Sequence, residues 1–293
     1  MKNVVVRTIS GVAFIIIMVA AILASKYSYI AIILLMIYVM TNEYFRISNN
    51  SKYSIITLLL VLTTSIYIFL CSYLIESINL CPKYLLMAAV PIMAIFISNL
   101  YIKSYNSHKN IVVNSTPVRV NNGYEAYPNA LIPIFYICIP LSMTSLIVFD
   151  NGNYSGKLLL SMFIILWASD VGAYCFGSTL GQKFGKKLFE SISPKKSWIG
   201  FLGGLFCSII AAIVLHYSHL LGLPTIESII LSIIICVFGV LGDLVESQLK
   251  RNFGAKDSGT FMPGHGGLLD RFDGALISFP LAIIYLEFFT NVA

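Results

Sequence analysis

The segment from residue 243 to residue 273 holds most of the side chains that could do chemistry in this chain. Only 11% of the 293 residues are charged, but this segment contains five carboxylates and four permanent cations. Carboxylate oxygens are hard ligands of the kind that bind Mg²⁺, and Lys and Arg neutralise phosphate oxygens. The sequence therefore predicts a site for phosphate and metal chemistry. On composition alone, the alternative is a basic loop placed between two membrane helices for topological reasons.

Three aspartates and one turn give this prediction its detail. Asp243, Asp270 and Asp273 are the candidate metal ligands. The turn at residues 263–267 reads Pro-Gly-His-Gly-Gly and has little side-chain bulk. Its backbone amides could therefore approach an anion closely, as the amides of phosphate-binding loops do.

A second candidate region begins inside an apolar stretch, at Asp170. A carboxylate within a membrane helix costs about 3 kcal/mol or more, so it indicates a function by default. A structural hydrogen bond to a neighbouring helix is the alternative explanation for Asp170.

The lysine-rich stretch that follows leads into another apolar run. Ser193 and Pro194 interrupt the chain just before a helix that Ser197 is expected to cap. Lys195 and Lys196 precede the positive end of this helix, which would suit a phosphate group. Lysines that only anchor the protein at the membrane surface are the alternative.

Specified positions over residues 247–273 resemble the signature of the phosphatidate cytidylyltransferases, the CDP-diacylglycerol synthases. They read Ser247-x-x-Lys250-Arg251-x4-Lys256-Asp257-x-Gly259-x3-Pro263-x-His265-Gly266-Gly267-x-x-Asp270-Arg271-x-Asp273. The stretch from Ser193 to Trp198 resembles a second family segment, Ser-Pro-Lys-Lys-Thr-Trp-Glu-Gly, with Ser197 in place of Thr. Ile199 stands where that segment has Glu, so no carboxylate role carries over to this position.

The resemblance implies a transferase that moves a cytidylyl group from CTP to phosphatidate, forming CDP-diacylglycerol and pyrophosphate. It implies Mg²⁺ as cofactor, with a second metal or a monovalent cation left open, and a homodimer; no nucleic-acid partner is expected. The candidate catalytic residues are Asp243, Lys250, Arg251, Lys256, Asp257, His265, Asp270, Arg271 and Asp273. The candidate substrate-binding residues are Asp170, Lys186, Lys187, Ser193, Lys195, Lys196, Ser247, Gly266 and Gly267.

Two other functions stay open on the sequence. A related CTP-dependent transferase could act on another lipid, such as an isoprenoid ether phosphate or a polyprenol. An ion-coupled transporter would also use an intramembrane Asp170 and basic loops. It would not need paired aspartates and a His-Gly-Gly turn.

The rest of the chain must position these residues within a membrane. A mean hydropathy of +0.85 and 58% apolar residues predict an all-α polytopic membrane protein with about nine transmembrane helices. The predicted spans cover residues 10–25, 28–42, 55–75, 84–102, 130–148, 157–177, 199–217, 225–243 and 274–290. Residues 1–129 would form an N-terminal region ending in a polar loop. Residues 130–293 would form the catalytic region, with cytoplasmic loops at 178–198 and 244–272.

Positive charge predicts the orientation. With a cytoplasmic N-terminus, only Lys26, Lys83 and Lys157 of the 19 Lys and Arg residues fall outside. Both candidate regions then face the cytoplasm, and a bacterial cytoplasmic (inner) membrane is the expected location. The first 25 residues also fit a secretory signal peptide, but a retained helix is the preferred interpretation.

Overall fold

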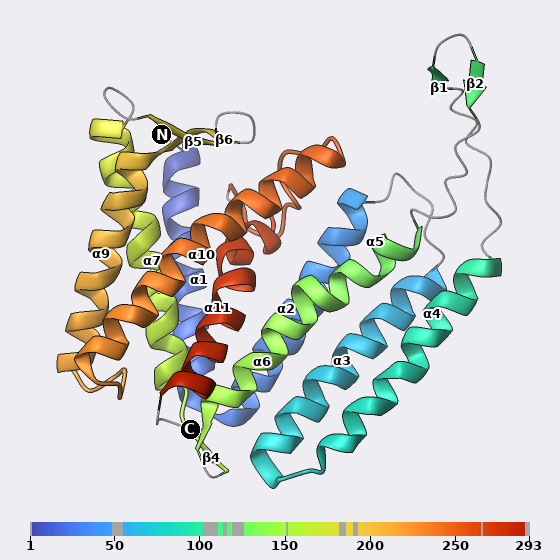
Figure 1. Ribbon diagram of the computed structural model, residues 1–293, viewed down its shortest axis with the longest axis horizontal. Helices are drawn as coiled ribbons and strands as arrows, with labels where there is room; N and C mark the ends of the chain where they lie inside the picture. The colour runs from blue at the N-terminus through green and yellow to red at the C-terminus, as the bar shows by residue number, and fades with distance from the viewer. Residues whose placement is uncertain are drawn as a thin grey trace.

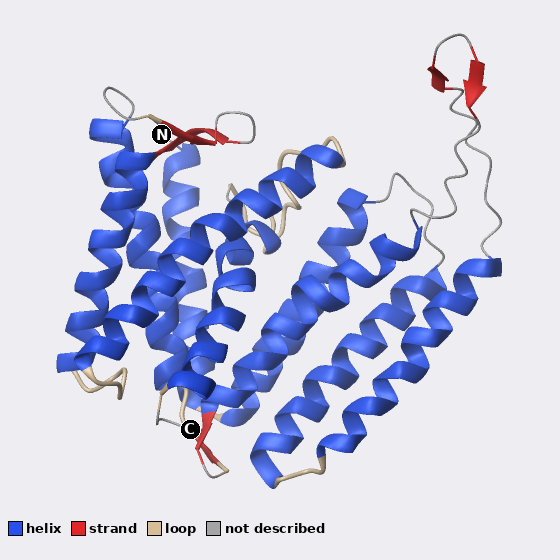
Figure 2. Ribbon diagram, viewed as in Figure 1, coloured by secondary structure: helices blue, strands red, loops and turns tan. Residues whose placement is uncertain are grey.

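The computed structural model describes residues 2–48, 55–101, 111–113, 116–118, 126–150, 152–181, 186–189, 193–264 and 266–290. Helices dominate this part of the chain (Figures 1 and 2). Seven of the described helices are long and apolar enough to cross a membrane, and two further apolar helices are shorter. The protein is therefore an all-α integral membrane protein, as predicted.

The helices follow the predicted order, and three short strand pairs, which the sequence analysis did not predict, lie between them. The helices are α1 (Lys2–Ala24), α2 (Lys26–Ser48), α3 (Ile55–Ile78), α4 (Ala89–Tyr101), α5 (Ala126–Ile132), α6 (Ile139–Val148), α7 (Lys157–Phe176), α9 (Trp198–Tyr217), α10 (Thr225–Asn252) and α11 (Leu269–Phe289), with a 3₁₀ segment η1 (Pro82–Ala88) and π-helical segments η3 (Pro133–Cys138) and η4 (Gly177–Gly181). Three short antiparallel pairs join them: β1 (Ile111–Val113) with β2 (Thr116–Val118), β3 (Phe149–Asp150) with β4 (Asn153–Tyr154), and β5 (Lys187–Phe189) with β6 (Ser193–Ser197). Each of the nine predicted apolar spans contains a helix.

A tight connection joins the first two apolar segments. Ser25 alone separates α1 from α2. Its hydroxyl accepts from the amide of Ser28 at 3.2 Å, and the hydroxyl of Ser28 accepts from the amide of Ser25 at 3.0 Å. These reciprocal bonds satisfy amides at the start of α2, as a capping box does.

Helices α7, α9, α10 and α11 form the part of the bundle that carries the candidate site. α7 packs against α9, α9 against α10, and α10 against α11. On the other side of the molecule, α3 and α4 pack together, and α3 also packs against α6 (Figure 1). The two candidate regions of the sequence therefore meet in one half of the bundle.

The three lysines that the sequence places outside lie at one end of the bundle. Lys26, Lys83 and Lys157 lie in the first turns of α2, η1 and α7. These elements begin at the end of the bundle where β4 lies, and the β5–β6 pair lies at the opposite end (Figure 1). The three lysines predicted to lie outside are thus at the end of the bundle opposite the β5–β6 pair.

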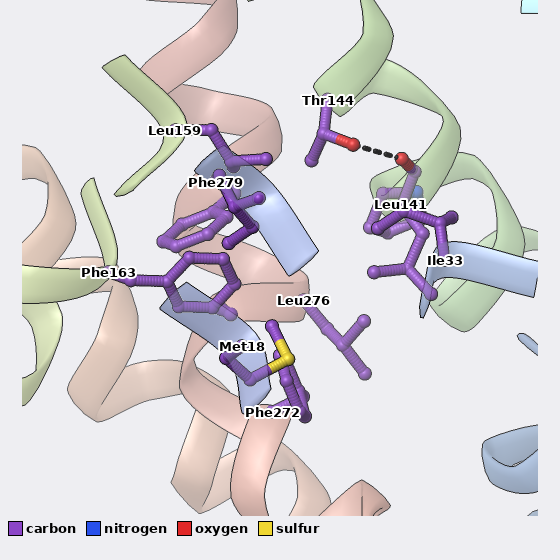
Figure 3. Close-up of a pocket in the computed structure, with 12 residues that line it drawn as sticks. Met18, Ile33, Leu141, Thr144, Leu159, Phe163, Phe272, Leu276 and Phe279 are labelled. Carbon is purple, nitrogen blue, oxygen red and sulfur yellow. Dashed lines mark hydrogen bonds between the residues drawn. The ribbon is translucent and has the colours of Figure 1, made fainter. Parts of the chain in front are cut away.

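An apolar core fixes the start of α11. The ring of Phe272 packs edge-on against Phe163 of α7 at 5.7 Å and against Phe14 of α1 at 5.8 Å, between ring centroids. Figure 3 shows Phe272 with Phe163, Phe279 and Met18 around a small apolar cavity. Because Phe272 points into this core, Asp270 and Asp273, three residues apart, share another face of the helix.

The helix ends differ from the predicted span ends. α10 continues to Asn252 and α11 begins at Leu269, so the predicted connection at 244–272 is helical at both ends. A span predicted from hydropathy ends at the first charged residues. The helix itself continues where these charged residues pair along one of its faces. The ends of α10 and α11 thus give the candidate residues defined positions on helices.

Close contact between α10 and α11 depends on Gly242. We expect Gly242→Ala to lower the melting temperature in detergent, because a Cβ there would lie 3.0 Å from the Cα of Gly274 and closer still to the carbonyl oxygen of Asp273. Overpacking of this kind costs about 1–3 kcal/mol. Leu241→Ala, at an exposed position on the same helix, is the matched control. A Gly242→Ala protein that melts like the wild type would contradict this packing argument.

Candidate active site

A cavity of about 520 Å³ lies where the two candidate regions meet. Its lining comes from α7, η4, β5, β6, α9, α10, α11 and the connection before α11. The lining residues include Asp170, Tyr174, Lys196, Ser197, Gly200, Phe201, Asp243, Lys250, Asp257, Asp270, Arg271 and Asp273. A volume of this size suits a small ligand or part of a larger one.

One face of α10 contributes a line of polar side chains. The line begins at Asp243 and continues three, four and seven residues later with Glu246, Ser247 and Lys250. This spacing places the four side chains on one side of the helix. The hydroxyl of Ser247 donates to Oδ1 of Asp243 at 3.2 Å. Ser247, predicted to bind substrate, is absent from the cavity lining and orients Asp243.

Lys250 lies between two carboxylates. Its Nζ is 2.5 Å from Oε2 of Glu246 and 2.6 Å from Oδ1 of Asp270. All three side chains are largely buried, and that of Glu246 is fully buried. Removing a charged group from such a cluster leaves an uncompensated buried charge. Lys250 therefore joins α10 to α11 as well as lining the cavity.

The second oxygen of Asp270 binds the backbone before α11. Oδ2 accepts from the amide of Gly267 at 2.8 Å and from the amide of Ser258 at 2.9 Å. Gly266 has φ +88°, a conformation that favours glycine, and a Cβ there would lie 2.7 Å from the same oxygen. The glycine turn thus approaches an anion closely, and within the described residues this anion is the carboxylate of Asp270. Binding of substrate by Gly266 and Gly267 stays a prediction.

Asp243 is the more accessible of the candidate metal ligands on α10 and α11. Its side chain is 43% exposed, and Oδ2 lies 2.6 Å from Nζ of Lys196. Lys196 also donates to the carbonyl oxygen of Val240 at 3.3 Å. The lysine-rich stretch and the segment from residue 243 to residue 273, which are far apart in the sequence, therefore contact each other directly in the cavity.

The start of α9 is capped as predicted. The hydroxyl of Ser197 accepts from the amide of Gly200 at 3.2 Å, and both residues line the cavity. The β5–β6 pair leads into this helix, and the amide of Trp198 donates to the carbonyl oxygen of Lys186 at 3.0 Å. The positive end of α9 therefore faces the cavity beside Lys196.

Several predicted residues lie outside the cavity lining. Lys186 and Lys256 are exposed, and Lys187 and Ser193 are partly exposed on β5 and β6. Arg251 donates to the carbonyl oxygen of Ala255 at 3.3 Å, across the turn that follows α10. His265 and the side chain of Lys195 lie outside the described part of the chain. The phosphate roles of these residues stay predictions.

The structure adds residues that sequence reasoning missed. Glu43 of α2 is buried and hydrogen-bonds to the backbone at the start of α11. It is an acidic residue at the end of an apolar stretch, which was the available signal. Phe201 also lines the cavity, and its aromatic character alone does not separate it from ordinary membrane-facing residues.

The lining suits a bound cation whose coordination shell is completed by substrate oxygens. Five carboxylates and three permanent cations line the cavity, so their formal charge is negative. A polyanion such as a triphosphate would be repelled without a further cation. Among the described residues, no group of three His, Cys, Asp or Glu side chains is arranged to hold a metal alone. Mg²⁺ is commonly held by one or two carboxylates together with phosphates, which fits Asp243 and its neighbours.

Together, the fold and the site define an integral membrane protein with a cavity lined by carboxylates and by ion-paired lysines. A family model described as "Cytidylyltransferase family" matches residues 5–289, and the chain therefore belongs to this family. A phosphatidate cytidylyltransferase of Staphylococcus haemolyticus (strain JCSC1435) is 38% identical over 192 residues, 65% of this chain and 71% of that protein. One of Staphylococcus aureus (strain COL) is 46% identical over 128 residues, 44% of this chain and 48% of that protein. These matches confirm the resemblance.

Proposed function

We propose that this protein transfers the cytidylyl group of CTP to phosphatidate, releasing pyrophosphate and forming CDP-diacylglycerol for phospholipid synthesis. The observation that carries this proposal is the cavity that joins Lys196, Asp243 and Lys250 in a member of the cytidylyltransferase family. An oxygen of the phosphatidate phosphate attacks the α-phosphorus of CTP, and the bond to the pyrophosphate oxygen breaks. The substrate provides the nucleophile, so no Ser or Cys nucleophile is required.

The position of the cavity supports a lipid substrate. Tyr174 lines the cavity and is also 76% exposed, and Val171, one turn earlier on α7, is 62% exposed. Exposed apolar side chains on a membrane helix face lipid. A phosphatidate head group can therefore enter the cavity beside Tyr174 while its acyl chains stay in the bilayer, which avoids about 0.8 kcal/mol per CH₂ exposed to water.

In the proposed reaction, the protein positions phosphates and neutralises their charge. Asp243 and Asp273 would hold Mg²⁺, which supplies positive charge to the transferred and leaving groups when bound. Lys196 would break its ion pair with Asp243 and bind a substrate phosphate. Arg271, at the cavity wall, would bind another phosphate. Lys250 and Asp270 hold α10 and α11 together, so we assign them to the geometry of the site as well as to its charge.

The location and assembly form part of the same proposal. The separation of Lys26, Lys83 and Lys157 from the cavity supports a cavity that faces the cytoplasm from a bacterial cytoplasmic membrane. A homodimer, which the resemblance implies, is proposed on that ground alone. Accessibility of single cysteines at each end of the bundle to an impermeant thiol reagent in intact cells tests the orientation.

Release of pyrophosphate by the purified protein tests the reaction. We expect turnover in detergent only when CTP, Mg²⁺ and phosphatidate are all present, with loss of activity on chelation of the metal. Turnover with an isoprenoid ether phosphate or a polyprenol and none with phosphatidate would change the lipid substrate. Ion flux in proteoliposomes without nucleotide, and no pyrophosphate with any lipid, would overturn the proposal in favour of a transporter.

A further inference from the structure

The start of α11 is capped by a side chain from a distant helix. Its first amides belong to Leu268 and Leu269, and no side chain at the start of α11 itself caps them. Oε1 of Glu43 accepts from the amide of Leu268 at 2.9 Å, and Oε2 accepts from the amide of Leu269 at 2.8 Å. Unpaired amides at a helix N-terminus carry partial positive charge, so a carboxylate binds there favourably.

The connection before α11 is shaped around this carboxylate. Glu43 is only 3% exposed, and the hydroxyl of Ser258 donates to it at 3.4 Å. A Cβ on Gly259 would lie 2.6 Å from Oε1 of Glu43, and a Cβ on Gly267 would lie 2.7 Å from Oε2. Burial of a carboxylate is costly unless hydrogen bonds replace its water, which these donors do. Glycine at 259 and 267 makes room for it.

The same connection also holds Asp270. Ser258 donates its hydroxyl to Glu43 and its amide to Asp270. The amide of Gly267 donates to Asp270, and the next two amides donate to Glu43. Displacement of the connection at Glu43 would therefore move the donors that orient Asp270, and with them the ion pair of Asp270 with Lys250 in the cavity.

We propose that Glu43 is a positioning residue for cytidylyl transfer: it fixes Ser258 and residues 267–269, and through them the Asp270–Lys250 pair, without contacting the substrates. Glu43 is absent from the cavity lining, which separates this role from the binding roles of Lys196 and Arg271. The effect on turnover rests on the proposed function, whereas the effect on the connection does not.

Glu43→Gln tests the proposal. The glutamine amide group is a donor, so one of the two amides at Leu268 and Leu269 loses its acceptor. We expect hydrogen exchange in residues 258–269 to become at least about tenfold faster while exchange in α7 and α9 is unchanged. Turnover should fall about 10- to 100-fold, with the KM for CTP changed by less than about threefold. Glu287→Gln, on the opposite end of α11, is the matched control.

A second variant makes the test independent of losing the carboxylate. Gly259→Ala keeps Glu43 but places a Cβ against it, and we expect the same faster exchange and lower turnover. Normal turnover or unchanged exchange in either variant would overturn the proposal, as would a loss of activity that only follows the loss of folded protein. A wild-type protein without turnover would refute the proposed function, while exchange at 258–269 would still show whether Glu43 holds the connection.

Discussion

Asp243→Asn is expected to lower turnover about 10²- to 10³-fold with little effect on folding. The substitution keeps the shape of the side chain but removes the charge that would bind Mg²⁺. The expected fall in turnover corresponds to a loss of several kcal/mol of transition-state stabilisation. Asp243 is 43% exposed, so its ion pair with Lys196 contributes no more than about 1 kcal/mol to stability. Pyrophosphate release as a function of Mg²⁺ concentration, together with thermal unfolding in detergent, measures both effects.

The matched control for this substitution is Asp150→Asn. Asp150 is an exposed aspartate in β3, outside the cavity lining. Asp150→Asn should leave turnover and its dependence on Mg²⁺ unchanged. Near-normal turnover of Asp243→Asn at low Mg²⁺ would remove Asp243 from the metal site. Asp273, which lines the same cavity, would then become the first candidate ligand.

Local patterns in the sequence predicted the helices and part of the site. Apolar runs predicted where each membrane helix lies, because a span needs about 20 apolar residues whatever surrounds it. Ser197 was expected to cap a helix, and it does so through the amide of Gly200. These features depend on neighbouring residues, so a single sequence contains them.

Local patterns of this kind could not predict contacts between distant segments. The pairing of Lys196 with Asp243 depends on how α9 packs against α10, and the bonds from Leu268 and Leu269 to Glu43 cross 225 or more positions. The glycine turn was expected to bind a phosphate, because its composition predicts an anion without identifying it. In the structure Asp270 is the anion that Gly267 binds, which only the tertiary arrangement could reveal.

Lys250→Met is expected to cause a larger loss of stability than Gly242→Ala or Asp243→Asn. It would leave Glu246, which is fully buried, and Asp270 without their shared cation. Loss of one partner from a buried ion pair typically costs about 3–5 kcal/mol. This corresponds to a fall in melting temperature on the order of 10 °C. Lys157→Met, at the exposed start of α7, is the matched control and should melt like the wild type.

The double variant Glu246→Gln/Lys250→Met separates stability from activity. Oε1 of Glu246 has no hydrogen-bond partner among the described residues, and Oε2 is ion-paired with Lys250. Glu246 is therefore the carboxylate that Lys250→Met leaves without a cation. Asp270 keeps two backbone donors. We therefore expect the second substitution to recover at least about half of the lost stability, because it removes the buried charge. Turnover should stay low, since Lys250 lines the cavity. A double variant no more stable than Lys250→Met would mean that Glu246 is not the residue Lys250 compensates.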